Sequence, residues 1–482
     1  MRRTGRSIWC TEWSSRSRWV NKAALVITIE RTSRLPVSAG EAFAWHQRPG
    51  AFERLLPPWE RVEVIEQRGG LENGGEVVLR VAWGPLALRW LARYRDCIPG
   101  HQFADEQVEG PFAHWLHRHV FDPDGPDACR LTDRIEYAPP LGPAGAIVGA
   151  RAVRPRLERM LRYRHLLLQE DLKTHRRIGL GQSLKVLVSG SRGLVGSSLV
   201  PFLTTGGHRV TRLVRGNPRA GEIQWDPAAG RLDPAQLEGI DAVVHLAGEN
   251  LAARWSAARK QAIRDSRIRG TRLLAQALAQ LARPPAVLVS ASAVGVYGNR
   301  GDEILTESSA TPAGPPDFLV EVAREWEAAT EPARAAGVRV VMLRSGLVLT
   351  PAGGVLGRML PAFRMGVGGR LGSGRQWMSW ISIDDAIGAI HHALTTESLS
   401  GPVNATAPHP VTNRDFAMTL GRVLGRPAIL PAPATALRLA FGEMADVALL
   451  AGARVIPGRL MGSGYEFRHG QLEGALRFVL GK

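Results

Sequence analysis

The amino-acid sequence predicts an α/β protein in which an α+β domain precedes a doubly wound parallel sheet. Strand and helix patterns alternate over residues 184–400, as they do in a parallel sheet that helices cover on both faces. A glycine-rich turn lies directly after the first of these strands. In residues 25–180, by contrast, several strands follow one another before a single long helix. At 482 residues the chain is too long for one core, and we expect two to three domains.

The composition excludes several classes of protein. Apolar residues make up 45% of the chain and charged residues 22%, which is ordinary for a globular protein and rules out wholesale disorder. No uncharged apolar run reaches the ~18 residues that a membrane helix needs. The cysteines lie far apart and form no CxxC pair, so we expect neither a disulfide framework nor a thiolate zinc site, and a cytoplasmic location. They are Cys10, Cys97 and Cys129.

The net charge of +17 comes largely from two segments. Residues 151–177 interleave arginine with leucine at helical spacing, and a solvated helix face explains them more simply than a polyanion-binding surface does. Residues 1–24 are rich in arginine, serine and tryptophan and lack the apolar core of a secretory signal. We expect them to be a disordered extension or a stretch upstream of the true start, although an organellar transit peptide has a similar composition. Nucleic acid is not needed to explain the charge.

Residues 25–180 predict one α+β domain. The strand ITIERTSRL precedes a short helix that Ser38 would cap, and six further strand patterns follow between turns. A long helix closes the domain, because apolar residues recur at helical spacing between Leu157 and Leu172. This order of elements, together with the stretch VSAGEAFAWHQRPGAFERLLPPWE, resembles the START-like (SRPBCC, polyketide-cyclase-like) helix-grip fold.

That resemblance implies an apolar ligand cavity between a curved sheet and the long helix. Trp83, Trp90 and Trp115 are candidates to line it, and ordinary core aromatics are an equally good interpretation.

Three histidines on one predicted strand of this domain invite a metal interpretation. In a strand, His117 and His119 share one face while His114 points to the other. No acidic residue clusters with them in the sequence, so we expect no metal ion there.

The first turn of residues 184–400 carries the clearest site in the sequence. Gly190, Gly193 and Gly196 have GxxGxxG spacing between the buried strand LKVLVSG and a helix. The first glycine permits the tight turn, the second lets backbone amides approach a pyrophosphate, and the third allows helix and sheet to pack closely. The helix N-terminus adds positive potential for the phosphates. This context predicts a Rossmann-type dinucleotide site.

The end of the second strand indicates which dinucleotide would bind. An NAD site usually carries an acidic residue there, but this chain has Arg215 and no acid before Glu222. Arg192 lies inside the glycine turn, and two guanidiniums could pair with a 2′-phosphate. The sequence therefore favours NADP(H), unless Arg215 merely points into solvent.

Motifs along the second half of the chain closely resemble the atypical extended short-chain dehydrogenase/reductases of the epimerase-like group. In order they are GSRGLVG, HLAGENLAARW, SRIRGTRLL, SASAVGVYG, DFLVEVAREWEAAT, LRSGLVL and LGSGRQWMSWISIDD. Residues 401–482 resemble that family's small C-terminal domain of unknown function.

The resemblance implies a role for individual residues. The phosphates would be held by Gly190, Ser191, Arg192, Gly193, Leu194 and Val195. The adenosine end would face Arg215, with Leu246, Ala247 and Gly248 bordering the adenine and ribose. Ser292 stands where the superfamily's substrate-polarising serine ends a strand.

The chain departs from the superfamily in its catalytic pair. The usual Tyr-xxx-Lys relay is impossible, because no lysine lies between Lys260 and Lys482. A helix with Asp317, Glu321 and Glu325 on one face stands in its place. Asp317 or Glu321 could replace the phenol as the acid, and Tyr297 is a second candidate. Acids that merely favour the start of a helix are the more economical interpretation.

The motif LGSGRQWMSWISIDD supplies candidates for substrate contact, because the corresponding region of the superfamily approaches the substrate. We expect Gln376, Trp377 and Ser379 to serve this role. The acidic pair Asp384 and Asp385 is better explained as the cap of the following helix.

These observations predict an NADP(H)-binding reductase or epimerase-like enzyme with a non-standard active site, fused to a domain that binds an apolar small molecule. The alternative is a non-catalytic NADP(H) sensor, which the missing relay favours. A small-molecule substrate is expected, without membrane or nucleic-acid partners; the oligomeric state stays open.

Overall fold

The computed structural model describes residues 26–482 apart from 85, 141, 178–182 and 313–316. The segment predicted to be an extension, residues 1–24, lies outside the described residues. Among those residues, no helix combines the length and the apolar character needed to cross a bilayer.

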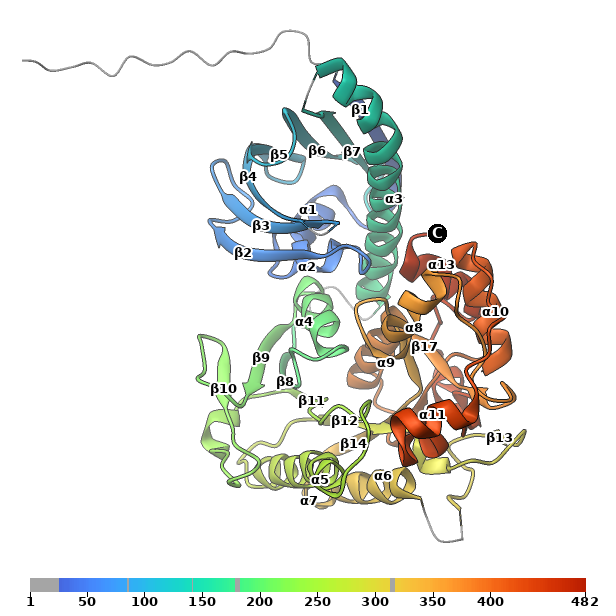
Figure 1. The fold of residues 1–482 in the computed structure, drawn as a ribbon. Coiled ribbons are helices and arrows are strands. Elements are labelled where there is room, and N and C mark those ends of the chain that lie inside the picture. The colour runs from blue at the N-terminus through green and yellow to red at the C-terminus, as the bar shows by residue number, and fades with distance from the viewer. Residues whose placement is uncertain (1–25, 85, 141, 178–182, 313–316) are drawn as a thin grey trace, which may run out of the picture.

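The N-terminal domain is an antiparallel sheet with one long helix along it (Figure 1). Its seven strands lie in the order β1-β7-β6-β5-β4-β3-β2, so the first strand returns beside the last. Helix α3 packs against β1 and β7. The strands are β1 (Ile27–Leu35), β2 (Val62–Arg68), β3 (Glu76–Trp83), β4 (Leu86–Ile98), β5 (Gln102–Glu109), β6 (His114–Pro123) and β7 (Cys129–Ala138), and the helices are α1 (Ala39–Gln47), α2 (Ala51–Leu55) and α3 (Gly142–Arg177).

Local sequence explains the elements of this domain. Ser38 caps α1 as predicted, accepting a hydrogen bond from the backbone N–H of Glu41. In β6 and β7 buried and exposed residues alternate, because one face of each strand packs toward α3 and the other faces solvent. The predicted helix-grip fold is confirmed by this sheet and helix.

The second sheet is parallel throughout, in the order β10-β9-β8-β11-β12-β14-β18. Its inner strands are almost wholly buried because helices cover both faces. Helices α4 and α9 pack together on one face, and α5 contacts α6 and α7 on the other (Figure 1). The strands are β8 (Lys185–Ser189), β9 (Arg209–Val214), β10 (Glu222–Gln224), β11 (Ala242–His245), β12 (Val287–Ala293), β14 (Arg339–Ser345) and β18 (Gly401–Ala405), and the helices are α4 (Gly196–Thr205), α5 (Ala257–Ala279), α6 (Phe318–Ala328), α7 (Glu331–Ala335), α8 (Gly354–Arg364) and α9 (Ile383–Thr395).

The doubly wound parallel sheet is therefore as predicted, but its edge lies later in the chain than the boundary expected at residue 400. Strand β18 follows that boundary and pairs with β14. A pairing partner is a tertiary property, and a composition change at a loop does not reveal it.

The C-terminal region is small and mostly helical, and it shares a core with the parallel sheet. Leu420 of α10 and Leu476 of α13 lie in the same buried cluster as Ile387 of α9. Short two-stranded pairs join it to earlier loops. The elements are α10 (Asn413–Leu424), α11 (Ala434–Phe441), α12 (Gly458–Gly462) and α13 (Leu472–Leu480), with the pairs β13 (Ile304–Leu305) with β20 (Arg454–Val455), β15 (Leu347–Leu349) with β17 (Trp380–Ser382), and β16 (Trp377–Met378) with β19 (Val411–Thr412).

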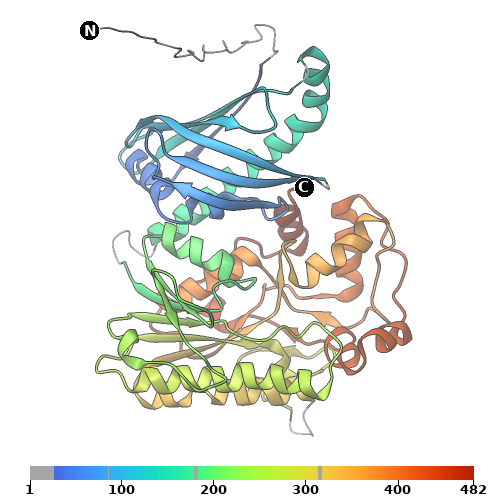
Figure 2. The same cartoon turned by 60° about the vertical axis from the view of Figure 1, so that its left-hand side comes forward.

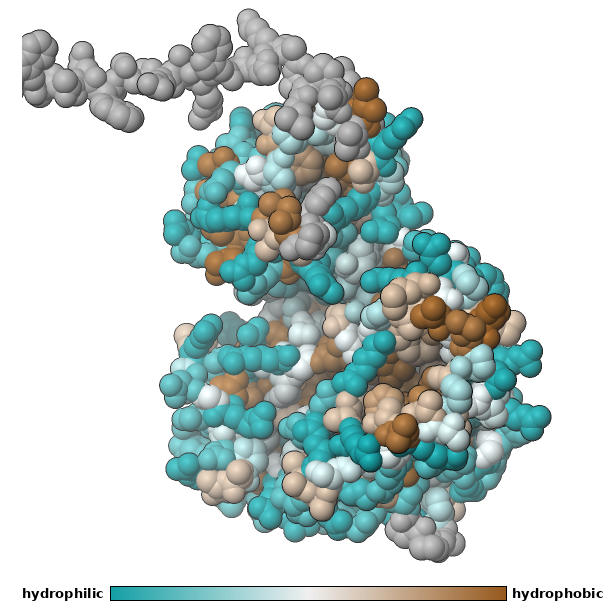
Figure 3. Space-filling model, in the orientation of Figure 1, coloured by the Kyte–Doolittle hydropathy of each residue, from teal (hydrophilic) through white to brown (hydrophobic). Residues whose placement is uncertain are grey.

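Figure 3 shows a largely hydrophilic face, on which apolar side chains gather over part of the C-terminal region. Two of the most exposed large apolar side chains of that region are Ile429 and Leu439, each 79% exposed.

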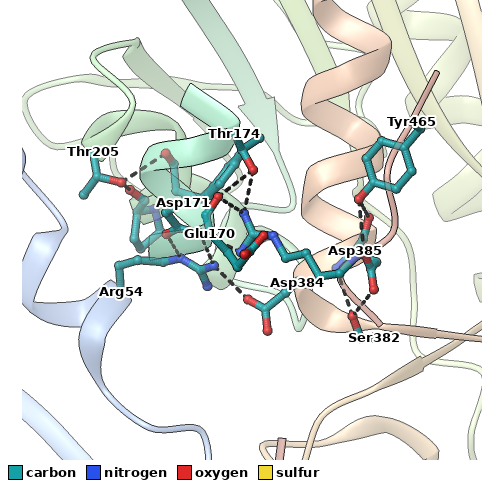
Figure 4. A network of polar contacts seen from close by, with 12 residues as sticks. Arg54, Glu170, Asp171, Thr174, Thr205, Ser382, Asp384, Asp385 and Tyr465 are labelled. Carbon is teal, nitrogen blue, oxygen red and sulfur yellow. Dashed lines mark hydrogen bonds and ion pairs between the residues drawn. The ribbon is translucent and has the colours of Figure 1, made fainter. Parts of the chain in front are cut away.

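The N-terminal domain rests on the remainder of the chain through α2, α3 and α4 (Figure 2). The end of the chain returns to this junction, where the ring of Phe478 in α13 lies 5.0 Å from that of Tyr163 in α3. A buried polar network crosses the same junction, and it is drawn in Figure 4. In it Arg54 of α2 contacts Asp171 of α3 and Asp384 of α9.

Candidate functional site

The glycine-rich turn joins β8 to α4 at the carboxyl edge of the parallel sheet. Gly190 has φ +68°, in the left-handed region that favours glycine. A Cβ atom on Gly190 would lie 2.7 Å from the carbonyl carbon of Leu246 and 2.8 Å from the nitrogen of Ala247. The turn therefore packs directly on the loop after β11, which only a glycine allows.

The turn leaves the start of α4 open to a ligand. A Cβ on Gly196 would lie 2.2 Å from the carbonyl oxygen of Gly190, so the helix starts against the turn itself. The N–H of Gly193 donates to the same oxygen at 2.9 Å. Val195 stands at the N-cap, and no side chain caps the helix. The N–H groups of Ser197 and Ser198 donate to the carbonyl oxygens of Gly193 and Val195, whereas among the described residues those of Leu194, Val195 and Gly196 have no acceptor and remain available to an anion.

The remaining residues predicted to bind the dinucleotide surround this turn. The N–H of Leu246 donates to the carbonyl oxygen of Ser189, which ties the loop that contains Ala247 and Gly248 to the end of β8. Ser191 is buried beneath the turn, and Leu194 reaches toward α8.

Two arginines and one acid lie at the end of the sheet where an adenosine would sit. Arg215 is exposed directly after β9, and within the described parts of the chain it forms no ion pair. Arg192 donates to Glu222 at 3.0 Å, with 66% of its side chain exposed. Glu222 comes close because β10 pairs with β9. The sequence shows Arg192 and Glu222 thirty positions apart and does not reveal this pair.

A buried arginine that the sequence does not single out lies beside the same loop. The guanidinium carbon of Arg267 in α5 is 3.5 Å from where a Cβ of Gly248 would stand. Burial lowers the pKa of Arg267 to about 10, and none of the ion pairs found in the described residues includes it. Its guanidinium donates to the carbonyl oxygen of Ile263 and stacks on Trp326. Arg267 lies in the motif SRIRG, but nothing in the sequence distinguishes it from the other members of the 61 lysines and arginines of the chain.

Ser292 belongs to a buried polar network at the carboxyl edge of the sheet. Ser292 and Arg344 are register partners on β12 and β14, so their side chains lie next to each other. The Ser292 hydroxyl donates to Glu327 at 2.7 Å. Arg344 donates to both carboxylate oxygens of Glu327 at 2.8 Å, in the bidentate arrangement that is the strongest for this pair.

Tyr297 extends the same network and is fully buried. Its hydroxyl donates to Asn404 at 2.8 Å and accepts from Arg344 at 2.9 Å. Burial raises the pKa of Tyr297, which disfavours the phenolate. The structure therefore brings Tyr297 and Ser292 into one network, but both hydroxyls are already hydrogen-bonded to other side chains of the protein.

Asp317 and Glu321 lie apart from this network. Asp317 is the N-cap of α6 and accepts from the backbone N–H groups of Leu319 and Val320. Glu321 is bound by Arg264 at 2.9 Å, and Arg264 also binds Glu325. The shared guanidinium offsets the repulsion between the two glutamates.

The residues predicted to contact substrate, Gln376, Trp377 and Ser379, all donate hydrogen bonds to other groups of the protein. Gln376 donates to the carbonyl oxygens of Leu371 and Leu449, and Trp377 donates to Asp302 at 2.7 Å. Ser379 is buried and donates to the carbonyl oxygen of Ala453.

The acidic pair that follows does not cap its helix. Ser382 caps α9, while Asp384 contacts Arg54 and Asp385 accepts from the backbone of Arg468. Both carboxylates are buried at the domain junction.

The N-terminal domain holds a cavity of about 460 Å³. Trp90 and Trp115 line it, as predicted, and their rings meet edge to face at 4.9 Å. The side chain of Trp83 lies outside the described residues.

The expectation that no acid joins His117 and His119 is wrong. Asp105 stands opposite His117 in the β5–β6 pair, and Asp133 stands opposite His119 in the β6–β7 pair. His114 is exposed on the other face, as predicted. Register between strands brings these residues together, and sequence distance hides it.

Three family models match the chain. Residues 186–405 match the NAD dependent epimerase/dehydratase family, residues 432–479 match a domain of unknown function (DUF1731), and residues 35–161 match the family named polyketide cyclase / dehydrase and lipid transport. The resemblances stated from the sequence motifs are confirmed.

Individual relatives agree with these matches. The epimerase family protein Mb2239 of Mycobacterium bovis is 47% identical over 61% of this chain and 97% of its own length. The crystal structure of a protein from Corynebacterium glutamicum, named a nucleoside-diphosphate sugar epimerase, is 35% identical with TM-score 0.77, over 94% of this chain and 90% of that one. Human epimerase family protein SDR39U1 (isoform 2), solved with NADPH, is 36% identical with TM-score 0.57, over 61% of this chain and 99% of its own.

The glycine turn, the parallel sheet and these relatives all indicate the same family. The chain belongs to the NAD-dependent epimerase/dehydratase family.

Proposed function

We propose that this chain binds NADP(H) at the carboxyl edge of the parallel sheet and uses it in an oxidoreductase or epimerase-like reaction. The observation that carries the proposal is the glycine turn before an α4 helix that no side chain caps. The NADPH with which human SDR39U1 was solved supports the choice of cofactor.

The residues at this edge fit the dinucleotide. Backbone amides of residues 194–196 would hold the pyrophosphate, and residues 246–248 would border the adenine and ribose. Arg215 would meet the 2′-phosphate, and Arg192, whose own side chain is exposed, would join it by exchanging its contact with Glu222. Arg267 places a buried positive charge beside the loop. NADPH supplies a hydride when it is bound.

Replacing Arg215 with alanine tests the cofactor assignment. We expect Arg215→Ala to weaken NADPH binding about tenfold or more while NADH binding stays unchanged, because a hydrogen bond to a charged group contributes about 1.5–3 kcal/mol. Isothermal titration of both nucleotides measures this. Arg209→Ala is the matched control, since Arg209 is exposed at the opposite end of β9. An equal loss for NADH, or no loss for NADPH, would contradict the assignment.

The reaction has to proceed without a Tyr-xxx-Lys pair. Ser292 and Glu327 are the polar side chains of the edge network that we expect to lie closest to a substrate, since Glu327 keeps 13% of its side chain exposed. Oxidation of NADPH in the presence of a panel of aldehydes and ketones tests this activity. Glu327→Gln removes the carboxylate that Ser292 contacts, and we expect it to lower any turnover that is found.

A non-catalytic NADP(H) sensor is the second candidate, and one observation favours it. The four side chains predicted for catalysis, Ser292, Tyr297, Asp317 and Glu321, all contact other groups of the protein. A sensor predicts a strong rise in the melting temperature with NADPH and no turnover of any carbonyl compound. No response to NADPH would contradict both candidates.

We also propose that the N-terminal cavity binds an apolar small molecule. Its walls combine aromatic rings with aliphatic side chains, among them Leu79, Phe112 and Met160. Polar and charged side chains, among them Glu60 and Arg164, also line it, and apolar walls with polar groups that orient a ligand are typical of ligand pockets.

A further inference from the structure

A cluster of histidines and aspartates forms one wall of the N-terminal cavity. Asp105, His117 and His119 line the cavity, and Asp133 and His165 lie directly behind them. Three neighbouring strands and helix α3 hold the five residues. The two cavity histidines and Asp133 are buried.

Three side-chain atoms of this cluster converge. Oδ2 of Asp105 lies 3.4 Å from Nδ1 of His117 and 3.8 Å from Nε2 of His119. One donor atom from each residue can be chosen so that all three lie within 4.8 Å of one another. Ligands bound at about 2.0–2.2 Å in a tetrahedral arrangement stand roughly 3.4 Å apart, so the three atoms are already close to that spacing.

The surrounding contacts are those that orient metal ligands. Nδ1 of His119 lies 2.6 Å from Oδ1 of Asp133, an ion-pair contact without hydrogen-bond geometry, and Nε2 of the same ring is turned toward Asp105. His165 contacts the other oxygen of Asp133 at 3.1 Å. Trp115 donates to Oδ1 of Asp105 at 3.3 Å, which leaves Oδ2 facing the histidines.

The cluster is not satisfied by the protein alone. Among the described residues, no hydrogen-bond partner reaches Nε2 of His117 or Nδ1 of His165, although both atoms are buried. Two carboxylates lie within the same small volume. Adjacent buried carboxylates repel each other, and a cation bound beside Asp105 would offset that repulsion.

We propose that Asp105, His117 and His119 bind a divalent first-row transition-metal ion, and that the free coordination positions of this ion face the cavity, where they bind an oxygen atom of an apolar ligand. Two histidines and one carboxylate with open positions suit catalytic zinc and non-haem iron alike. The metal site is independent of NADP(H); its use by a ligand rests on the proposed role of the cavity.

Cobalt titration of the full chain, stripped of metal with a chelator, tests the ion site. One Co²⁺ per chain should bind and give the intense visible absorption of a four- or five-coordinate ion. Zn²⁺ should displace the bound Co²⁺ in a competition titration. A titration with Fe²⁺ under anaerobic conditions shows whether the site prefers iron or zinc. A weak six-coordinate spectrum, or less than one ion per chain, would overturn the site.

Substitutions locate the ion. We expect His117→Gln to weaken Zn²⁺ binding at least about 100-fold and Asp133→Asn to weaken it about 10- to 100-fold. His114→Gln is the matched control, because His114 lies on the same strand with its side chain exposed on the opposite face. Unchanged affinity in His117→Gln would overturn the assignment. Circular dichroism checks that each variant is folded. If a variant does not fold, the cobalt spectrum of the unaltered protein still tests whether the ion site exists.

Decanoate, which joins a carboxylate to an apolar chain, tests whether the ion binds an oxygen atom of an apolar ligand. In the cobalt-loaded protein, decanoate should change the visible spectrum at concentrations at which acetate, which has the same carboxylate and no apolar body, does not. An unchanged spectrum, or an equal response to acetate, would overturn the ligand proposal while the ion site stands. NADPH titration of the same sample reports separately on the parallel sheet.

Discussion

Replacing Asp171 with alanine is expected to destabilise the protein by about 3–5 kcal/mol, because it breaks a buried ion-pair network at the domain junction. Asp171 of α3 is fully buried. Arg54 of α2 donates to it twice, at 2.7 and 2.9 Å, and Arg468 donates at 2.7 Å (Figure 4). Burial alone would raise the pKa of Asp171, but the two guanidiniums hold it well below its usual range.

The network is balanced only while every member is present. Arg54 also donates to Asp384 at 2.7 Å, so two arginines face two carboxylates. Without Asp171, both guanidiniums would share the single carboxylate of Asp384 in a region closed to solvent. An uncompensated buried charge is the main reason for the large expected effect.

Urea unfolding followed by circular dichroism measures the change. Glu158→Ala is the matched control: Glu158 lies on the same helix and pairs with Arg154, but about half of each side chain is exposed. A surface pair of this kind contributes about 0.3–0.5 kcal/mol. Asp171→Asn should retain the shape and lose the charge, with an intermediate loss. If Asp171→Ala costs no more than Glu158→Ala, the network does not stabilise the junction.

Features that depend on neighbouring residues were predictable from the sequence. The glycine turn is complete within seven residues, and its positions 190 and 196 are those where a Cβ would collide with backbone. Ser38 caps a helix through a group three residues away. Such local chemistry does not need the tertiary fold.

Features that depend on register or on domain docking were not predictable. Asp105 and His117 are twelve positions apart and become neighbours only because β5 and β6 pair in one register. Arg54 and Asp384 are separated by 330 positions, and the abundance of arginine gave no reason to select Arg54. The local rule assigned Asp384 to a helix cap that Ser382 already provides.

For the catalytic candidates, the sequence shows which residues are missing but not which of the remaining acids are free. The absence of a Tyr-xxx-Lys pair follows from the positions of lysine alone. Whether a replacement acid is free depends on what it touches, and the contacts of Asp317 with backbone and of Glu321 with Arg264 could not be read from their spacing.

Acidification from pH 7.5 to 5 is expected to destabilise the protein by several kcal/mol, because the folded chain buries neutral histidines. Burial lowers the pKa of His175 to about 3 and that of His245 to about 4, and it lowers the pKa of His391 well below the usual value. In the unfolded chain these groups titrate near pH 6.5. Below that pH these histidines bind protons in the unfolded chain but stay neutral in the folded chain. The free energy of unfolding therefore decreases as the pH falls.

Not every histidine acts in this direction. In the protein without a bound metal ion, burial lowers the pKa of His119, but Asp133 and Asp105 outweigh it and raise the value to about 9, so an ion at the proposed site would have to displace this proton. Its contribution to stability is complete below pH 6.5 and is lost as the pH rises through 9, so it offsets part of the acid loss.

His175 offers the sharpest test, because an apolar ring can replace it. Neither ring nitrogen of His175 has a hydrogen-bond partner among the described residues, and the ring packs 4.7 Å from that of Phe202. The charged and titratable groups that face it are Asp171, Arg468, Arg54 and the two histidines His208 and His391. We expect His175→Phe to preserve stability at pH 7.5 and to reduce the loss between pH 7.5 and 5 by about 2 kcal/mol, the linkage free energy of one such group.

Urea unfolding at both pH values measures this difference. His114→Gln serves as the control, because it replaces a histidine whose side chain is exposed. If His175→Phe unfolds with the same pH dependence as the unaltered protein, His175 is not held neutral in the folded state. Because His175 lies in α3 and packs on Phe202 of α4, its protonation would act on the same junction as the loss of Asp171, and the two substitutions should not be additive.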